Sequence, residues 1–542
     1  MTLFIEDADS LEKLVDSTYF AKIDFDSERH GQNYNLFIGK HFDRDENIVS
    51  WISPIARLRL KKNGKASYEI PNGQRKEVFI NEKYSYIITN SDITYLTLDR
   101  EDNERELIFH KHLSEKKDFA LPEIIAQLEA AQDTIIRLDP KGGFLISGPA
   151  GSGKTTLALH RLAYLIQSPE FTEYFKAEDI IVFVSDNSAI KYFSTLLLDL
   201  GIKTAKVLTF LEWSLAVVNQ NFNKRYKALT KDQALSILNY EMEVGTNLNP
   251  EIIFNEIRKY KLEALKNIGK ENVGLDRLFN IYNSFQSKSP FLKIFKSFIN
   301  NQQEDYWLDD IDTALLCKNT EVHKRVYSHI VVDEVQNWLP MQLDIIKIIT
   351  DVKFDSVTYV GDINQRTKPF TIRSWNELEE GYPVDNEVTL TKAYRNTKSI
   401  LSWLEKEDYD VNVDMVTEIG KAVIEMNFVN DKLKHEHITA ELNKLVDTGY
   451  KGQVGVLSKY IEELDFSKNQ NWPDNYHFLT SEDSQGMEFD TVFIANKNSF
   501  LDKNQFFELE CDISKEEFTK VDRQLLFVAA TRAKSELIIL NS

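Results

Sequence analysis

The sequence has little cysteine and no long apolar run. Cys317 and Cys511 are the two cysteines among 542 residues, and they form neither a C-x-x-C pair nor a set with zinc-ligand spacing. This usage fits a reducing compartment, so we expect a cytoplasmic protein. No stretch approaches the roughly 20 apolar residues that a membrane-spanning helix needs, and the first residues lack the basic and apolar regions of a signal peptide. We therefore expect no membrane partner.

The chain also lacks an excess of basic residues. It has 65 Lys and Arg against 85 Asp and Glu, a net charge of −20. Because basic surface drives phosphate binding, this balance argues against a protein that coats nucleic acid.

One local stretch, residues 255–298, differs because basic side chains outnumber acidic ones there and aromatic rings lie among them. Such a mixture suits single-stranded nucleic acid. We favour the alternative, an amphipathic helical subdomain whose lysines face solvent. The basic and aromatic residues of the stretch are Arg258, Lys259, Lys261, Lys266, Lys270, Arg277, Lys288, Lys293, Lys296, Tyr260, Phe279, Tyr282, Phe285, Phe291, Phe295 and Phe298.

A phosphate-binding loop is predicted at residues 148–156, which match the pattern G-x-x-x-x-G-K-[ST]. A short apolar run precedes the loop, and apolar positions at helical spacing follow it. Glycines let successive backbone N–H groups turn onto phosphates, and the following helix end favours negative charge. We expect Lys154 to reach the β- and γ-phosphates and Thr155 to ligate Mg²⁺. The residues of the predicted loop are Gly148, Pro149, Ala150, Gly151, Ser152, Gly153, Lys154, Thr155 and Thr156.

Apolar, strand-like runs alternate with helical stretches after the loop, which predicts a doubly wound α/β core. The run at 328–332 ends in Asp333 and Glu334. In a nucleotide site, such an aspartate can hold Mg²⁺ and such a glutamate can polarise the attacking water. Gln365 follows the next strand-like run, where an amide beside the γ-phosphate could sense hydrolysis.

Four regions are expected along the chain. Residues 1–120 read mostly as strands separated by turn signals and predict a β-rich domain. Residues 121–211 and 326–385 form the first α/β core, and the polar, helical stretch 212–325 is an insertion in it. Residues 386–542 form a second α/β core without a phosphate-binding loop. Two cores with one loop suggest that nucleotide binds at the seam and that arginines of the second core complete the site.

Seven motifs occur in an order that resembles superfamily 1 helicases and translocases of the UvrD/Rep type. They are Gln132, the loop at 148–156, VDEVQ at 332–336, VGDINQ at 360–365, YRN at 394–396, QGMEF at 485–489 and VAATRA at 528–533. The resemblance runs from about residue 125 to the C-terminus. It implies two RecA-like cores that hydrolyse ATP with Mg²⁺ and move on single-stranded nucleic acid, with DNA favoured.

The resemblance also implies how the nucleotide would be held. Gln132 would contact adenine, and Tyr394 would stack on its face. Glu488 would hold the ribose side, and Gly486 would allow close approach.

Catalytic roles follow from the same resemblance. Glu334 would be the water-activating base and Asp333 the metal partner. Gln336 and Gln365 would position water and sense the γ-phosphate. Arg395 and Arg532 would be arginine fingers from the second core, acting on the charge that spreads over the transferring phosphoryl group.

Several stretches look closer to HelD-like ATPases, which remodel bacterial RNA polymerase. These stretches are residues 34–40, 49–57, 158–164, 340–343 and 361–367. The segment before residue 34 is too short for the coiled-coil arm of HelD, and 396–484 is too short for the accessory domain that UvrD and Rep insert there. Gln485 stands where a lysine is usual.

Three functions remain open at this point. The first is an ATP-driven motor on single-stranded nucleic acid. The second is a remodeller of RNA polymerase or another protein complex. The third is the helicase or sensor subunit of an anti-phage or repair complex, whose nuclease would be a separate chain because no nuclease carboxylate cluster is apparent here.

Overall fold

The computed structural model describes most of the chain and divides it into two compact units. The described residues are 19–27, 32–39, 42–43, 45–70, 74–89, 92–98, 130–149, 152–221, 225–242, 250–266, 274–287, 291–319, 327–381, 384–390, 396–411, 419–468, 471–485, 487–502 and 512–542. The first unit contains residues Met1–Pro140, Thr156–Ile180 and Tyr192–Ala205, and the second contains Lys141–Thr155, Ile181–Lys191 and Lys206–Ser542.

The first unit contains a six-stranded sheet, which confirms the expected β-rich N-terminal region. Its strands are β1 (Ala21–Ser27), β2 (Asn33–Gly39), β3 (Ile48–Ser50), β4 (Gly64–Glu69), β5 (Arg75–Thr89) and β6 (Asp92–Leu98). The order is β3-β2-β1-β5-β4, with β6 also paired to β5. Ala21, Ile23 and Phe25 alternate along β1 as buried residues, so one face of the sheet is packed.

A short 3₁₀ helix, η1 (Pro54–Leu60), and the turn before it contact the helical segment around Asp133 and Arg137. Arg57 Nε and Arg137 Nε donate to the buried carboxylate of Asp133 in α4 (Ala130–Ile136), at 3.0 and 3.1 Å. Arg137 also donates to the backbone oxygens of Ile52, at 2.7 Å, and Trp51, at 3.1 Å. These bonds fix α4 against the segment 51–57.

The second unit holds two parallel sheets, which confirms the predicted pair of RecA-like cores. The first sheet has the order β14-β7-β13-β12-β8-β9. Its strands are β7 (Gly143–Ser147), β8 (Ile180–Val184), β9 (Lys206–Thr209), β12 (His329–Val332), β13 (Val357–Gly361) and β14 (Asn386–Thr389). Every residue of β7, β8, β12 and β13 is buried, as expected for strands covered on both faces.

One predicted boundary differs from the observed sheet. The first core was expected to end at residue 385, whereas β14 pairs in parallel with β7, from Asn386 beside Phe144 to Thr389 beside Ser147. This strand therefore belongs to the first sheet. Its short, half-polar sequence carries no signal that would assign it to one core or the other.

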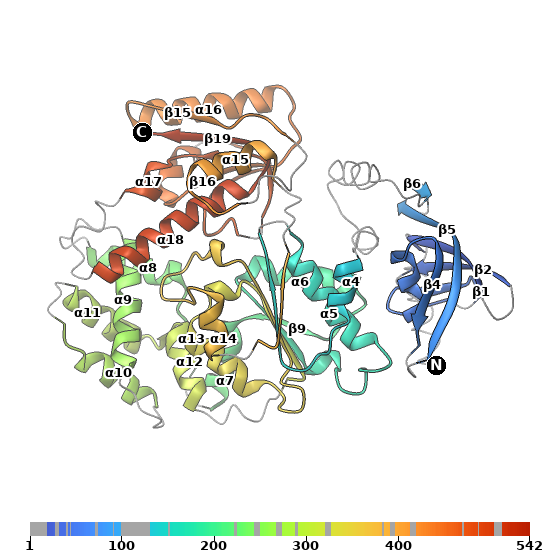
Figure 1. Cartoon of the computed structure of the whole chain (residues 1–542). Helices are drawn as coiled ribbons and strands as arrows, with labels where there is room; N and C mark the ends of the chain where they lie inside the picture. The colour runs from blue at the N-terminus through green and yellow to red at the C-terminus, as the bar shows by residue number, and fades with distance from the viewer. Residues whose placement is uncertain are drawn as a thin grey trace. The chain divides into compact units, whose positions relative to one another are not determined.

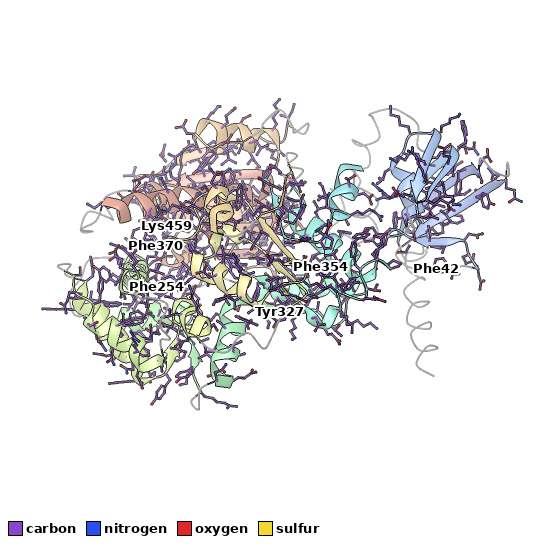
Figure 2. The ribbon with its side chains drawn as sticks, turned by 60° about the horizontal axis from the view of Figure 1, so that its bottom comes forward. Phe42, Phe254, Tyr327, Phe354, Phe370 and Lys459 are labelled. Atoms are coloured by element: carbon purple, nitrogen blue, oxygen red, sulfur yellow. The ribbon has the colours of Figure 1, made fainter. Side chains whose placement is uncertain are left out.

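Helices fill the region between β9 and β12. They are α7 (Phe210–Asn221), α8 (Lys231–Met242), α9 (Pro250–Leu265), α10 (Leu275–Ser284), α11 (Leu292–Glu304) and α12 (Asp310–Asn319) (Figure 1). A two-stranded ladder of β10 (Lys227–Ala228) and β11 (Trp307–Leu308) accompanies them. Phe254 of α9 and Tyr327, ahead of β12, are both labelled in Figure 2. They share one hydrophobic core with Leu145 and Phe183 of the sheet. The helical insertion is therefore packed continuously with the first core.

The second sheet has the order β15-β19-β18-β16-β17. Its strands are β15 (Ile424–Asn427), β16 (Val454–Ser458), β17 (Tyr476–Thr480), β18 (Phe489–Ile494) and β19 (Ala533–Asn541). One core contains Leu537 and Ile539 with residues of α15 (Lys398–Lys406) and α18 (Asp512–Thr531). The other contains Ile538 and Leu540 with residues of α16 (Asp431–Asp447). Since alternate residues of β19 face different helices, the sheet is covered on both faces, and Figure 1 shows α16 and α18 on opposite sides of β19.

Candidate active site

The predicted phosphate-binding loop connects β7 to α5 (Lys154–Gln167). Gly148 has φ 148° and Gly153 has φ 83°, which are values that favour glycine. A Cβ atom on Gly148 would lie 2.5 Å from the backbone oxygen of Leu390, so this position also requires glycine for space. Lys154 Nζ donates to the backbone oxygen of Pro149 at 2.9 Å. The lysine ammonium is thus held over the loop that would carry the phosphates.

Two oxygen groups meet at the end of β12. Thr155 Oγ1 donates to Asp333 Oδ1 at 3.3 Å, and the backbone N–H of Asp333 donates to the oxygen of Phe183 at 2.9 Å. Burial, and next the charge of Glu334, raise the pKa of Asp333 well above its ordinary value, although Lys154 opposes this shift. Burial therefore disfavours the charged form of Asp333, and a cation bound beside it would favour that form.

Glu334 has an unusual backbone for a side chain of its size. Its φ of 48° and ψ of 45° lie in the left-handed region, which costs a non-glycine residue on the order of 1 kcal/mol. The side chain of Gln336 donates to the Glu334 carboxylate from Nε2. The turn thus points the carboxylate toward the amide that was expected to position water.

Gln336 also contacts the segment that follows β13. Its Oε1 accepts from the backbone N–H of Asp362 at 3.1 Å, and Gln365 Nε2 donates to Asp362 Oδ2 at 2.7 Å. A Cβ on Gly361 would lie 2.4 Å from Gln336 Oε1, so glycine is needed for this approach. The structure therefore brings Glu334, Gln336 and Gln365 into one hydrogen-bonded group.

Arg532 joins this group from the second core. The buried guanidinium donates from Nη2 to Gln365 Oε1 at 3.0 Å. Its Nε donates to the oxygen of Val528 at 3.2 Å and its Nη1 to the oxygen of Met487 at 3.3 Å. Arg532 is consequently held by its own core while it contacts the other one.

The seam also contains side chains to which the sequence motifs assigned no role. Gln485 Nε2 donates to the backbone oxygen of Gln365 at 3.4 Å, and its Oε1 accepts from Thr367 Oγ1 at 3.3 Å and Asn337 Nδ2 at 3.4 Å. The departure from lysine at position 485 was the one available signal. Asn337 directly follows the motif at 332–336, and Thr367 lies two residues after the motif at 360–365, but nothing in their sequence indicated this contact.

Other expected site residues are only partly described. Tyr394, Arg395, Gly486, Ala150 and Gly151 lie outside the described residues. Gln132 lies in α4 of the first unit, and its side chain is outside the described part of the chain. Glu488 Oε2 lies 3.1 Å from Lys534 Nζ, and both side chains are partly exposed.

Aromatic rings of the stretch 255–298 lie in the interior, whereas Lys266, Arg277 and Lys293 are exposed. Phe279, Tyr282, Phe295 and Phe298 are at most 2% exposed. Rings in the core cannot stack on bases, so the structure agrees with the favoured helical subdomain.

Two of the basic residues in this stretch are neutralised by aspartates just beyond it. Lys261 Nζ lies 2.7 Å from Asp309 Oδ2 and 2.8 Å from Asp312 Oδ2, with all three side chains buried. Arg258 donates to both carboxylate oxygens of Asp310, at 2.5 and 3.0 Å. These lysine and arginine side chains stabilise the insertion and are unavailable to a phosphate backbone.

Comparison with known proteins gives two family matches. The model of the UvrD/REP helicase N-terminal domain matches residues 128–367, and that of the viral superfamily 1 RNA helicase core domain matches residues 311–541. The ATP-dependent DNA helicase PcrA of Staphylococcus epidermidis is 23% identical over 304 aligned positions, and the match covers 52% of this chain and 39% of that protein. PcrA of Staphylococcus aureus is 23% identical over 283 aligned positions, and the match covers 48% of this chain and 37% of that protein. The chain matches about two-fifths of the length of these curated relatives.

Proposed function

The chain belongs to the UvrD-like helicases of superfamily 1, and from this membership we propose that it hydrolyses ATP between its two cores and moves on single-stranded nucleic acid, with DNA favoured. The observation that carries the proposal is the hydrogen bond from Arg532 to Gln365, because it brings a cation of the second core to the acidic group of the first. A seam between two cores is the place where nucleotide binding can change their separation.

Residues of the first core have separate roles in binding and hydrolysing ATP. Lys154 exchanges its bond to the Pro149 oxygen for the phosphates. Glu334 accepts a proton from the attacking water. Gln336, which already donates a hydrogen bond to the Glu334 carboxylate, orients that water. Gln365 contacts the γ-phosphate when ATP is bound. Its hydrogen bond with Arg532 links that contact to the second core.

Mg²⁺ fits the oxygens at this place. The Thr155 hydroxyl and the Asp333 carboxylate are hard ligands of the kind that Mg²⁺ prefers. Among the described residues, no group of three or more His, Cys, Asp or Glu could hold a metal ion, so phosphates and water would complete the shell. When bound, Mg²⁺ supplies positive charge that offsets the charge of the phosphate oxygens.

Arg532 stabilises the negative charge that spreads over the transferring phosphoryl group. Such arginines are worth roughly 10³ or more in rate. Arg395 is proposed as a second finger on the strength of the YRN motif. Closure of the seam around ATP and reopening after hydrolysis would step the nucleic acid along.

The proposal is tested by ATPase measurements on the full chain with single- and double-stranded DNA and RNA. We expect single-stranded DNA to raise the rate. Lys154→Ala should lose ATP binding, whereas Glu334→Gln should bind ATP and fail to hydrolyse it. A rate that no nucleic acid changes would count against a motor.

A second candidate function is remodelling of RNA polymerase or another protein complex. It is favoured by the N-terminal sheet, since β1 to β6 lie outside the residues that the family models match. A client that raises the ATPase rate without nucleic acid would support it. The same assay with a co-purified nuclease subunit tests the third candidate, a subunit of an anti-phage or repair complex.

A further inference from the structure

Helix α18 lies along the segment that carries Gln365 and contacts it at three places. Glu517 near its start pairs with Arg366, Gln524 Nε2 donates to the backbone oxygen of Ile363 at 3.0 Å, and Arg532 directly after its end reaches Gln365. Spacings of seven and then eight residues keep these positions on one side of a helix. The three contacts therefore belong to one continuous docking face.

Glu517 is a buried charge of the second core whose described partners come from the first. Its side chain is 5% exposed and that of Arg366 is 4% exposed. Oε1 also accepts from the backbone N–H of Phe370 at 3.0 Å, and Arg373 Nε lies 3.7 Å from Oε2. The rings of Phe370, labelled in Figure 2, and Phe518 meet edge to face with centroids 5.8 Å apart. Separation of the cores would leave this carboxylate without these partners.

The ends of this contact are far apart on α18 but adjacent on the other core. A helix rises about 1.5 Å per residue, so Glu517 and Arg532 lie about 22 Å apart along α18. Their partners Arg366 and Gln365 are neighbours in sequence, so the two partner side chains reach in opposite directions along the helix. A slide of α18 by one residue, about 1.5 Å, would break a hydrogen bond of 3.0 Å at either end.

We propose that Glu517 and Gln524 are positioning residues that fix the place of α18 on the first core and thereby hold Arg532 at Gln365. The inference rests on the proposed ATP hydrolysis, in which Arg532 acts on the transferring phosphoryl group. Arg532 follows the helix because Val528 and Met487 hold its guanidinium. Glu517 contacts Arg366 and Phe370, and Gln524 contacts the Ile363 backbone, so both would act on the site through Arg532.

The test compares two adjacent glutamates of α18 in the nucleic-acid-stimulated ATPase of the full chain. Glu517→Gln should lower kcat by about 10- to 100-fold, the cost of a misplaced catalytic group, and leave KM for ATP within about twofold, because Lys154 and Thr155 are unchanged. Glu516→Gln is the control, since that side chain is 69% exposed and pairs with Lys520 on the same helix. It should leave both constants unchanged.

A double-mutant cycle separates positioning from a general loss of stability. If Glu517 acts through Arg532, Glu517→Gln combined with Arg532→Ala should have the kcat of Arg532→Ala alone. If the double variant instead lost kcat by the product of the two single-variant factors, the inference would be overturned. A wild-type kcat in Glu517→Gln would overturn it as well. Gln524→Ala, which removes one side-chain hydrogen bond, provides the second variant and should show the same non-additivity if Glu517→Gln does not fold. A wild-type chain that fails to turn over ATP would instead overturn the proposed function, and the inference with it.

Discussion

The hydroxyl of Thr155 lies 3.3 Å from Oδ1 of Asp333, although 178 residues separate the two in sequence. The contact joins the first turn of α5 to the end of β12 through the parallel sheet, in which β13 pairs with both β7 and β12. A hydroxyl and a carboxylate at this edge can supply two of the oxygen ligands that a hard cation requires. The geometry makes the metal dependence of the proposed reaction open to direct test.

Asp333→Asn should lower kcat for ATP by about 10²- to 10³-fold and raise the Mg²⁺ concentration needed for half-maximal rate, because one charged oxygen ligand is lost. The measurement is a Mg²⁺ titration of the ATPase rate. Asp344→Asn is the matched control. Asp344 lies on α13 (Pro340–Ile349), is half exposed and pairs with Lys318. An unchanged Mg²⁺ requirement in Asp333→Asn would show that the cation binds elsewhere.

Arg532→Ala should lower kcat by about 10³-fold with little change in KM for ATP, because an arginine finger acts mainly in the transition state. Arg532→Lys should not restore the rate, since an ammonium cannot reproduce the bonds of the planar guanidinium to Gln365, Val528 and Met487. Steady-state ATPase kinetics give both constants. Lys520→Ala, on an exposed position of α18, should behave as wild type.

The local parts of this site could be predicted from sequence. The glycine loop, the strand before it and the carboxylates that follow β12 each depend on neighbouring residues, so their pattern is visible in a single stretch. The contacts of Glu517 are different, because its partner Arg366 is 151 residues away. A glutamate among other glutamates on a helix gives no sign that it will be buried against another core.

The insertion shows a second limit of sequence patterns. A count of charges over residues 255–298 gives a basic excess, whereas the acids that pair with Arg258 and Lys261 lie at 309, 310 and 312. Periodicity can indicate which face of a helix is apolar, but it cannot show that a lysine on that helix will be buried beside two aspartates. Part of the basic excess is therefore neutralised inside the insertion by these aspartates, while Lys293 of the same stretch is exposed.

Lys261→Met should destabilise the chain by about 3–5 kcal/mol at pH 7, because it leaves Asp309 and Asp312 buried without their cation. Chemical denaturation followed by tryptophan fluorescence is the measurement. Lys293→Met, at an exposed position of α11, should change the free energy of unfolding by less than about 0.5 kcal/mol. Equal effects of the two substitutions would contradict the assigned role of the buried lysine.

In the first unit, Arg137→Ala should loosen the segment around Trp51 more than Arg57→Ala does. Arg137 is mostly buried and donates to Asp133 and to the oxygens of Trp51 and Ile52, whereas Arg57 is 40% exposed and pairs with Asp133. Unpaired buried carbonyls cost about 1–3 kcal/mol each, and exposed ion pairs contribute about 1 kcal/mol or less. Hydrogen exchange over residues 51–60 should therefore accelerate strongly in Arg137→Ala only.

The ion pair of Arg366 and Glu517 should also make stability depend on pH. Burial by itself raises the pKa of Glu517, but the hydrogen bond and charge of Arg366 and the N–H of Phe370 lower it below the ordinary 4.5. A depressed pKa in the folded state means that the unfolded chain binds the proton more readily. The stabilisation is therefore fully present above about pH 4.5 and is lost as the pH falls through the folded-state pKa.

Glu517→Gln removes the charge at every pH, so the difference in unfolding free energy between wild type and this variant isolates the effect. We expect that difference to be largest at pH 6–7 and to narrow steadily below pH 4.5, measured by urea denaturation at each pH. Glu516→Gln, exposed on the same helix, should show no such trend. A difference in unfolding free energy that grows as the pH falls would mean that Glu517 is protonated in the folded chain. Arg366 would then contact a neutral carboxylic acid and not a carboxylate.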